Sequence, residues 1–457
     1  MKIIILFQFL FISVITFPQI TFQKTFGGEL EEKGNAIQQT SDGGFVIAGS
    51  TKSYGYCSSD FYIIRIDQYG DTLCTKTYGG TGYEFANNIF QTQDDGFIIE
   101  GFTTSFGASD GGIYLVKTNE FGDTLWTKTI GTADAFIPEE MIKTSDGGYI
   151  ICGRTEQWSS NYKFSLAKIN VNGDTTWTKA YEYGIAESIQ QTSDGGYILV
   201  VYPYAPPSIR LDIMLVKTNE VGELTWTKFY GGTEADVGFA VQQTSDNGYI
   251  LAGRTDSFGA GASDFFLLKT DSNGDSLWMK TYGGIYDERA FALEKTSDGG
   301  FIIAGYTATF GAGYFDFYLV RTDEYGDTLW TRTHGGNWQE EVSDIMQTSD
   351  EGYAAVGYTY SFGSGSSSNI YVVKTDQFGM ITGISDPDYN YDSDFHIFQN
   401  YPNPFNPSTI ISWQLPVSSN VTLKIFDVLG NEVATIVNEE LTAGKHEAVF
   451  DAAHYSS

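Results

Sequence analysis

The chain repeats one short phrase at a nearly constant interval, and this repeat limits the possible folds more than any other feature. The phrase reads KTSDGGFIIAGYT at residues 295–307 and QTSDGGFVIAGST at residues 39–51. Seven copies of one unit cover most of the chain, as in a repeat architecture. The turn aspartate of the phrase recurs at intervals of 52, 52, 48, 52, 52 and 52 residues, as Asp42, Asp94, Asp146, Asp194, Asp246, Asp298 and Asp350.

Each unit has the pattern of four short antiparallel strands. In residues 285–336, AFALEKT leads into the SDGG turn and FIIAGYT leaves it, then DFYLVRTD follows a glycine-rich loop and DTLWTRT follows a second hairpin. An acidic residue that opens a tight turn, followed by glycine where φ is positive, is typical of such hairpins. The runs have the β-branched and aromatic content of strands.

Seven units of four strands predict an all-β fold, a seven-bladed β-propeller over residues 20–385, rather than a solenoid. Residues 20–28 read ITFQKTFGG, a copy of the strand that reads LWMKTYGG at residues 277–284, whereas the seventh unit ends in FGMITGISD. The first strand should therefore complete the last blade by pairing with the strand at Tyr371–Lys374. Strand order and closure resemble those of WD40-type propellers, although the WD40 sequence signatures are absent.

The two ends of the chain differ from the repeat. Lys2 precedes an apolar run from Ile3 to Phe17, which is shorter than the ~20 residues of a membrane-spanning helix and predicts a signal peptide over residues 1–19. The formal net charge of −31 repels phosphate backbones, so we expect no nucleic-acid partner.

An acidic linker is predicted over residues 386–397. Oxygen-bearing side chains alternate along it and could hold Ca²⁺, so calcium is the one cofactor that the sequence suggests. The segment lacks the glycine and the distal glutamate of an EF-hand loop, which favours a solvated linker. The alternating residues are Asp386, Asp388, Asn390, Asp392 and Asp394.

Residues 398–457 carry a specific motif. They contain VTLKIFDVLGNEV and, near their start, the run Tyr401, Pro402, Asn403, Pro404, Phe405, Asn406 and Pro407. This stretch resembles the type A C-terminal sorting domain of the type IX secretion system. The resemblance implies a partial immunoglobulin-like β-sandwich and the type IX machinery as partner. It also implies a secreted or outer-membrane-surface location, reached through the periplasm. The sequence stops at FDAAHYSS, before the family's last strands, so we expect an incomplete domain with an unpaired edge.

Two columns of basic residues run through the repeat, and we interpret both as structural. Cross-strand pairing with nearby aspartate, or stacking on the neighbouring tryptophan, is favoured over a repeated anion site. The first column is Arg65, Lys117, Lys168, Lys217, Lys269, Arg321 and Lys374. The second is Lys24, Lys76, Lys128, Lys179, Lys228, Lys280 and Arg332.

The sequence contains no zinc motif, phosphate-binding loop or paired Cys/His that would indicate a catalytic site. One column of carboxylates lies eight residues before the threonine of the first strand in five units. These groups either accept backbone N–H bonds between blades, which we favour, or form a ring around the axis that binds a cation. They are Glu32, Glu84, Asp236, Glu288 and Glu340.

Blades three and four depart from the repeat in their loops, which read EQWSSNY at residues 156–162 and YPYAPPS at residues 202–208. If these loops share one face, their aromatic residues form a platform for a ligand. Ordinary loop drift is the simpler interpretation. The predicted platform is Phe136, Trp158, Tyr162, Tyr202 and Tyr204.

The sequence therefore predicts a secreted or cell-surface propeller that acts as a non-catalytic binding or structural module. We expect a monomer with a glycan or protein ligand. The alternative is an extracellular carbohydrate-active or other hydrolytic enzyme with a site in the central channel. Divergent acidic residues that point into the channel would favour the enzyme, and uniform channel walls would favour the binding module.

Overall fold

The computed structural model describes residues 19–56, 58–107, 111–131, 135–157, 161–181, 184–203, 212–363, 367–381, 396–397, 408–415, 419–426, 432–442 and 444–451. Regular structure in these ranges is entirely β, and no helix among them is long and apolar enough to cross a membrane. The chain divides into two compact units, residues 1–383 and 384–457.

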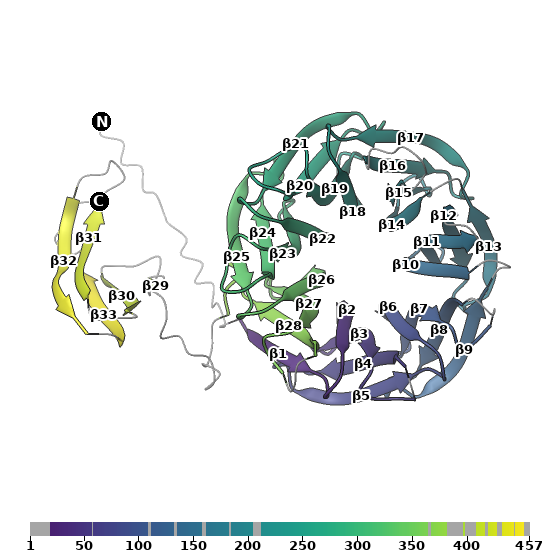
Figure 1. Ribbon diagram of the computed structural model, residues 1–457, viewed down its shortest axis with the longest axis horizontal. Helices are drawn as coiled ribbons and strands as arrows, with labels where there is room; N and C mark the ends of the chain where they lie inside the picture. Colours follow the sequence, from purple (N-terminus) through teal and green to yellow (C-terminus); the bar gives the residue numbers. More distant parts are fainter. Residues whose placement is uncertain are drawn as a thin grey trace, which may run out of the picture. The chain divides into compact units, whose positions relative to one another are not determined.

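The first unit is a ring of seven four-stranded antiparallel sheets, which confirms the predicted propeller (Figure 1). Blade 1 comprises β2 (Glu32–Gln39), β3 (Phe45–Thr51), β4 (Asp60–Ile66) and β5 (Thr72–Tyr78). Blade 2 comprises β6 (Glu84–Gln91), β7 (Phe97–Thr103), β8 (Gly112–Thr118) and β9 (Thr124–Ile130). Blade 3 comprises β10 (Ala135–Lys143), β11 (Tyr149–Gln157), β12 (Asn161–Ile169) and β13 (Thr175–Ala180).

The remaining blades repeat this order. Blade 4 comprises β14 (Ile185–Gln191), β15 (Tyr197–Tyr202), β16 (Ile213–Thr218) and β17 (Leu224–Tyr230). Blade 5 comprises β18 (Asp236–Gln243), β19 (Tyr249–Thr255), β20 (Asp264–Thr270) and β21 (Ser276–Tyr282). Blade 6 comprises β22 (Glu288–Lys295), β23 (Phe301–Thr307), β24 (Asp316–Thr322) and β25 (Thr328–His334). Blade 7 comprises β26 (Glu340–Gln347), β27 (Tyr353–Thr359), β28 (Asn369–Thr375) and the N-terminal strand β1 (Phe22–Phe26).

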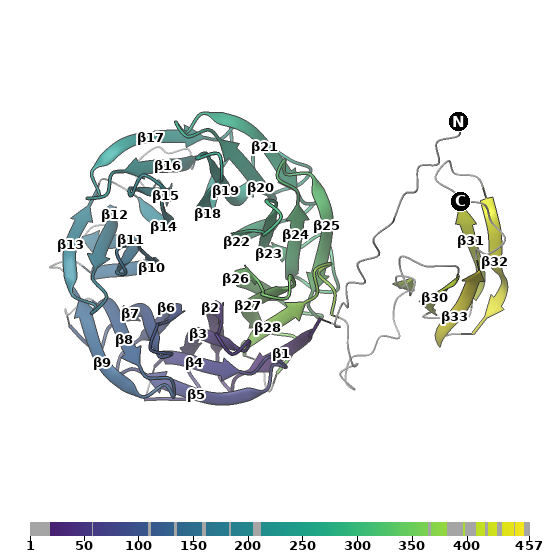
Figure 2. The same ribbon diagram turned by 180° about the vertical axis from the view of Figure 1, so that it is seen from behind.

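The first strand of each blade is innermost, around the centre of the ring, and the fourth is outermost (Figures 1 and 2). The second and third strands are almost wholly buried, as the unbroken apolar runs predict, because neighbouring blades cover both of their faces. Ala48 and Phe61 of blade 1, for example, pack with Ala86 and Ile99 of blade 2.

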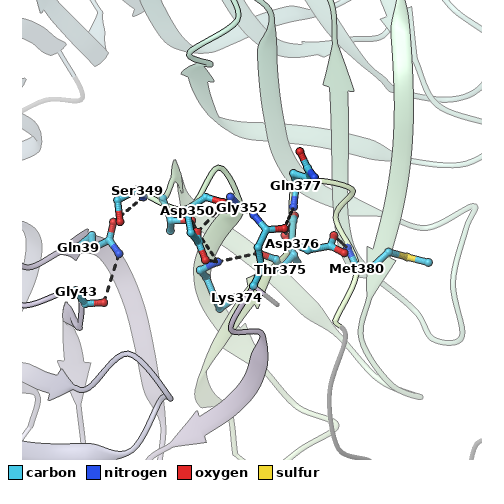
Figure 3. A network of polar contacts seen from close by, with 12 residues as sticks. Gln39, Gly43, Ser349, Asp350, Gly352, Lys374, Thr375, Asp376, Gln377 and Met380 are labelled. Carbon is cyan, nitrogen blue, oxygen red and sulfur yellow. Dashed lines mark hydrogen bonds and ion pairs between the residues drawn. The ribbon is translucent and has the colours of Figure 1, made fainter. Parts of the chain in front are cut away.

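The ring closes as predicted. β1 pairs antiparallel with β28 from Phe22 opposite Lys374 to Phe26 opposite Ile370. Figure 3 shows the polar contacts at this seam, where the Ser349 N–H donates to Gln39 Oε1 at 2.9 Å. The same bond joins Ser41 to Gln91 between blades 1 and 2. The closing junction thus repeats a contact found between blades 1 and 2.

The two positions that follow the turn aspartate favour glycine for different reasons. Positive φ occurs directly after the aspartate, as at Gly43 with φ 86°. The next glycine is required by close packing instead, because a Cβ at Gly44 would collide with the Ile66 carbonyl oxygen.

Both basic columns are structural, as predicted. Every cation of the first column pairs with the turn aspartate of its own blade, as Lys374 Nζ does with Asp350 at 3.0 Å (Figure 3). In the second column, five lysines pair with an aspartate of the next blade. The other two cations, Lys179 and Arg332, lie over the rings of Trp177 and Trp330.

The second unit contains two small antiparallel sheets. One is β29 (His396–Ile397), β30 (Ser408–Leu415) and β33 (Gly444–Asp451), and the other is β31 (Ser419–Phe426) with β32 (Glu432–Leu441). Trp413 and Phe450 are buried in this unit, which gives it a small core of its own.

Candidate functional site

The five predicted ring carboxylates are buried at the junctions between blades, and protein donors occupy them. Glu340 accepts the Gly336 N–H at 2.8 Å, the Thr359 hydroxyl at 2.7 Å and the Ser361 N–H at 3.1 Å. Gly336 belongs to the segment that connects blade 6 to blade 7. The other four carboxylates have the equivalent glycine and threonine donors. The contacts therefore support the interblade role that we favoured from the sequence.

A second acidic residue lies beside the first at most of these junctions. A Cβ on Gly335 would collide with the side chains of both Asp316 and Glu340. Burial raises the pKa of Asp316 to about 6, and the negative charge of Glu340 adds to this rise. At the closing seam, the equivalent pair is Asn369 and Glu32, so the amide replaces one carboxyl group.

The aromatic platform predicted on blades 3 and 4 differs from the arrangement in the structure. We expected Phe136 on the surface, but it is only 1% exposed, because its ring fills the core between blades 2 and 3 with Ile113 and Ile130. Tyr162 and Tyr202 are half-buried, and the Arg154 guanidinium lies over the Tyr162 ring at 5.7 Å. Trp158 and Tyr204 lie outside the described residues.

The predicted calcium linker, Asp386 to Asp394, and the sorting motif, Tyr401 to Pro407, also lie outside the described residues. Within the part of the chain that the structure describes, no three His, Cys, Asp or Glu side chains are grouped so that they could hold a metal ion.

The innermost strands carry a feature that the sequence analysis missed. Each has a β-bulge after its third residue, or after its second in β14 and its fourth in β10, and the bulge frees one side chain from the regular alternation. The seven residues differ in kind around the ring: amides in blades 1 and 2, carboxylates in blades 3 and 4, phenyl rings in blades 5 and 6 and a hydroxyl in blade 7. They are Asn35, Asn87, Glu139, Glu187, Phe239, Phe291 and Ser343.

The two bulge carboxylates belong to one charged group. Glu139 forms an ion pair with Arg154, which also lies 3.6 Å from a Glu156 carboxylate oxygen. Burial raises the pKa of Glu187 to about 8, and the charge of Glu139 adds to it. Burial also raises the pKa of Glu139, against the opposing charge of Arg154. A protonated carboxyl group can donate a hydrogen bond or a proton near neutral pH.

A third carboxylate lies beside this group. Glu100 is completely buried on β7, where the Asn88 amide donates to its Oε2 at 3.1 Å. Its Oε1 has no hydrogen-bond partner. Burial raises the pKa of Glu100 to about 8, and the charges of Glu139 and Glu140 contribute. A buried polar atom without a partner is costly in a purely structural role, so this atom points to a functional site.

Glu140 has a structural partner. It accepts the Ile189 N–H at 2.7 Å, which joins blade 3 to blade 4, and burial raises its pKa to about 7. Asp344 makes the equivalent bond to Ile37 at the closing seam.

The sequence did contain a signal for part of this site. Glu100 interrupts an otherwise apolar strand, FIIEG, at a position held by Ala48, Cys152 or Val200 in other blades. The bulge position varies between blades, while the residue before it stays small or apolar. We name Glu100, Glu139, Glu187 and Arg154 the acidic cluster.

The comparisons with known proteins identify the end of the chain. Residues 399–457 match the family model described as the secretion system C-terminal sorting domain, which confirms the resemblance found in the sequence. A sorting domain of this family indicates export, to the cell surface or into the medium. The chain is therefore an exported seven-bladed β-propeller protein with a C-terminal sorting domain.

The relatives of the propeller are distant. The regulatory protein FlaEY of Caulobacter vibrioides is 26% identical over 160 residues, which cover 30% of this chain and 17% of that protein. Among solved structures, puromycin hydrolase has a TM-score of 0.50 at 12% identity and covers 84% of this chain and 58% of its own. The Dos1 propeller has a TM-score of 0.47 at 10% identity, with 79% and 98% covered. The likeness to puromycin hydrolase shows the fold alone.

Proposed function

We propose that this exported propeller is a non-catalytic binding module that holds its ligand at the acidic cluster on blades 2 to 4. The observation that carries the proposal is the unpartnered, fully buried Oε1 of Glu100 beside Glu139, where the other blades have small or apolar residues. Elsewhere in the repeat, the recurring charged side chains form ion pairs and hydrogen bonds between strands and blades.

The chemistry of the cluster favours a ligand that offers hydrogen-bond donors. Carboxyl groups accept bonds from hydroxyl or ammonium groups, and the Phe239 and Phe291 rings, at the equivalent bulges of blades 5 and 6, add apolar contacts. The two rings lie 5.2 Å apart. A glycan or a hydroxyl-rich segment of a protein fits this mixture.

Hydrolysis of a glycan is the second candidate, because the walls are not uniform. Glu139 and Glu187 supply two carboxyl groups from neighbouring blades, and the pKa of Glu187, raised to about 8, suits the proton donor that glycoside hydrolysis requires.

A glycan and protein array probed with the secreted protein tests both candidates. Glu139→Gln and Glu187→Gln should each weaken the binding that the screen finds. Glu294→Gln is the matched control, because Glu294 lies on an innermost strand of blade 6 and is bonded to Gln242 at 3.0 Å. If the protein hydrolyses the bound glycan, and both variants still bind it but no longer hydrolyse it, the protein is an enzyme. Binding that neither substitution changes would contradict a ligand at the acidic cluster.

The route of export belongs to the proposal as well. We infer passage of the inner membrane through the predicted signal peptide, followed by passage of the outer membrane through the type IX machinery. The match over residues 399–457 supports the second step.

A further inference from the structure

Two aromatic side chains from neighbouring blades lie stacked on the surface where blade 6 meets blade 7. Tyr314 lies in the loop between β23 and β24, and Trp338 lies in the loop that leads into β26. Their ring centroids are 6.3 Å apart and their planes are within 9° of parallel. The two side chains are 71% and 60% exposed, so a flat apolar surface faces solvent.

Backbone contacts across the junction hold this pair in place. The Tyr314 N–H donates to the Trp338 carbonyl oxygen at 3.0 Å, and the Trp338 N–H donates to Ser361 Oγ at 2.8 Å. Phe315 and Gln339 also form a parallel bridge. Because both backbones are fixed, little conformational entropy is lost when a ligand stacks on the rings.

Polar side chains follow Trp338 along the chain and lie on the strand paired with this segment. The Gln339 amide contacts the Tyr358 hydroxyl at 3.1 Å and the Glu341 carboxylate at 2.5 Å. Tyr360 lies edge-on to Tyr358 at 5.9 Å and is 40% exposed. The surface therefore combines flat aromatic faces with an amide, a carboxylate and phenol groups.

We propose that this surface binds a neutral polysaccharide, with one pyranose ring lying on the stacked pair and its hydroxyl groups bonded to Gln339 and Glu341. A pyranose has an apolar C–H face and a hydroxyl-bearing edge, which match these two kinds of group. The net charge of −31 opposes polyanions. Two rings make a contact much smaller than the ~800 Å² per partner of a stable protein interface.

Another junction provides a matched control. Tyr286 occupies the place of Trp338 where blade 5 meets blade 6, and its N–H donates to Thr309 Oγ1 at 3.0 Å. It is 58% exposed, but in the opposite loop Ala262 takes the place of Tyr314. Tyr286 is therefore an exposed aromatic at the same position without a stacked partner.

Affinity electrophoresis of the full chain through gels that contain a soluble polysaccharide tests the proposal. The neutral probes are mixed-linkage β-glucan, galactomannan and dextran, and alginate is the anionic probe. At least one neutral probe should retard the protein. Trp338→Ala and Tyr314→Ala should each raise the dissociation constant about tenfold, as expected for the loss of one stacking ring. Trp338→Phe should keep most of the affinity, and Tyr286→Ala should keep all of it.

Four results would overturn this inference: no retardation by any neutral probe, retardation by alginate alone, equal loss of affinity in Tyr286→Ala, or undiminished affinity in Trp338→Ala. The surface is separate from the acidic cluster, so the inference does not rest on the proposed function. Loss of retardation in Trp338→Ala and Tyr314→Ala reports on this surface alone, whereas loss of array binding in Glu139→Gln and Glu187→Gln reports on the acidic cluster, which keeps the two outcomes distinguishable.

Discussion

Replacing Asp316 by asparagine should stabilise the propeller at neutral pH and have little effect at pH 4. Asp316 is buried beside Glu340, and its pKa is raised from 3.8 to about 6. A carboxyl group whose pKa is raised in the folded state lowers the free energy of unfolding when it is ionised. The penalty is therefore present above the folded pKa and disappears as the pH falls below the unfolded pKa.

The magnitude follows from the size of the shift. A rise of about two pKa units corresponds to about 3 kcal/mol, which we reduce to about 2 kcal/mol for screening by solvent. An asparagine keeps an oxygen that can accept the Ala312 and Gly313 N–H groups, which now donate to Asp316 Oδ2 at 3.0 and 3.1 Å. Its amide N–H₂ can face Glu340. Asn369 already occupies the equivalent place beside Glu32 at the seam.

The reverse substitution at the seam is the matched control. Asn369→Asp puts a second carboxyl group beside Glu32 and should destabilise the fold by a similar amount at pH 7.5 and by much less at pH 4. Thermal unfolding of the full chain at both pH values measures this, and we expect opposite shifts of a few degrees in the two variants. Equal shifts at pH 4 and pH 7.5, or shifts of the same sign, would refute the electrostatic reasoning.

Three further predictions concern the ring and its export. Removal of residues 20–28 deletes β1 and leaves β28 with an open edge, so the melting temperature should fall sharply or the protein should aggregate; an unchanged melting temperature would argue against closure by this strand. Lys374→Met leaves Asp350 without its buried partner and should cost about 2 kcal/mol in denaturant unfolding, whereas Lys24→Met, at an exposed pair, should cost less than about 0.5 kcal/mol; equal losses would disprove the role of burial. Deletion of residues 399–457 should retain the protein in the periplasm of a host with the type IX machinery, as immunoblots of cell fractions would show, and efficient release of this variant would contradict the sorting role.

Much of the fold was predictable because the contacts that define one blade lie within one repeat unit. One unit contains the turn, the four strands and the cation that pairs with its own turn aspartate, as Lys374 does with Asp350. The strand copy at residues 20–28 predicted which strand closes the ring, and the pairing of Phe22 with Lys374 confirms it. The sorting motif was readable for the same reason, since its residues are consecutive.

The candidate sites depend instead on contacts between blades, which no single unit contains. Phe136 was expected at the surface, yet its direction is set by packing against blade 2, and it is buried. Glu139 and Glu187 come from equivalent positions in two blades, and only the bulges bring them into one charged group.

The stacked pair at the junction of blades 6 and 7 shows the same limit. The sequence by itself determined the number of blades, the order of strands and the closing strand, because hydrophobic periodicity and turn chemistry act over a few neighbouring residues. Only the tertiary structure decided that Tyr314 lies on Trp338, and that Glu100 is buried without a partner for its Oε1. Those arrangements depend on which side chains of adjacent blades meet when the apolar faces pack together.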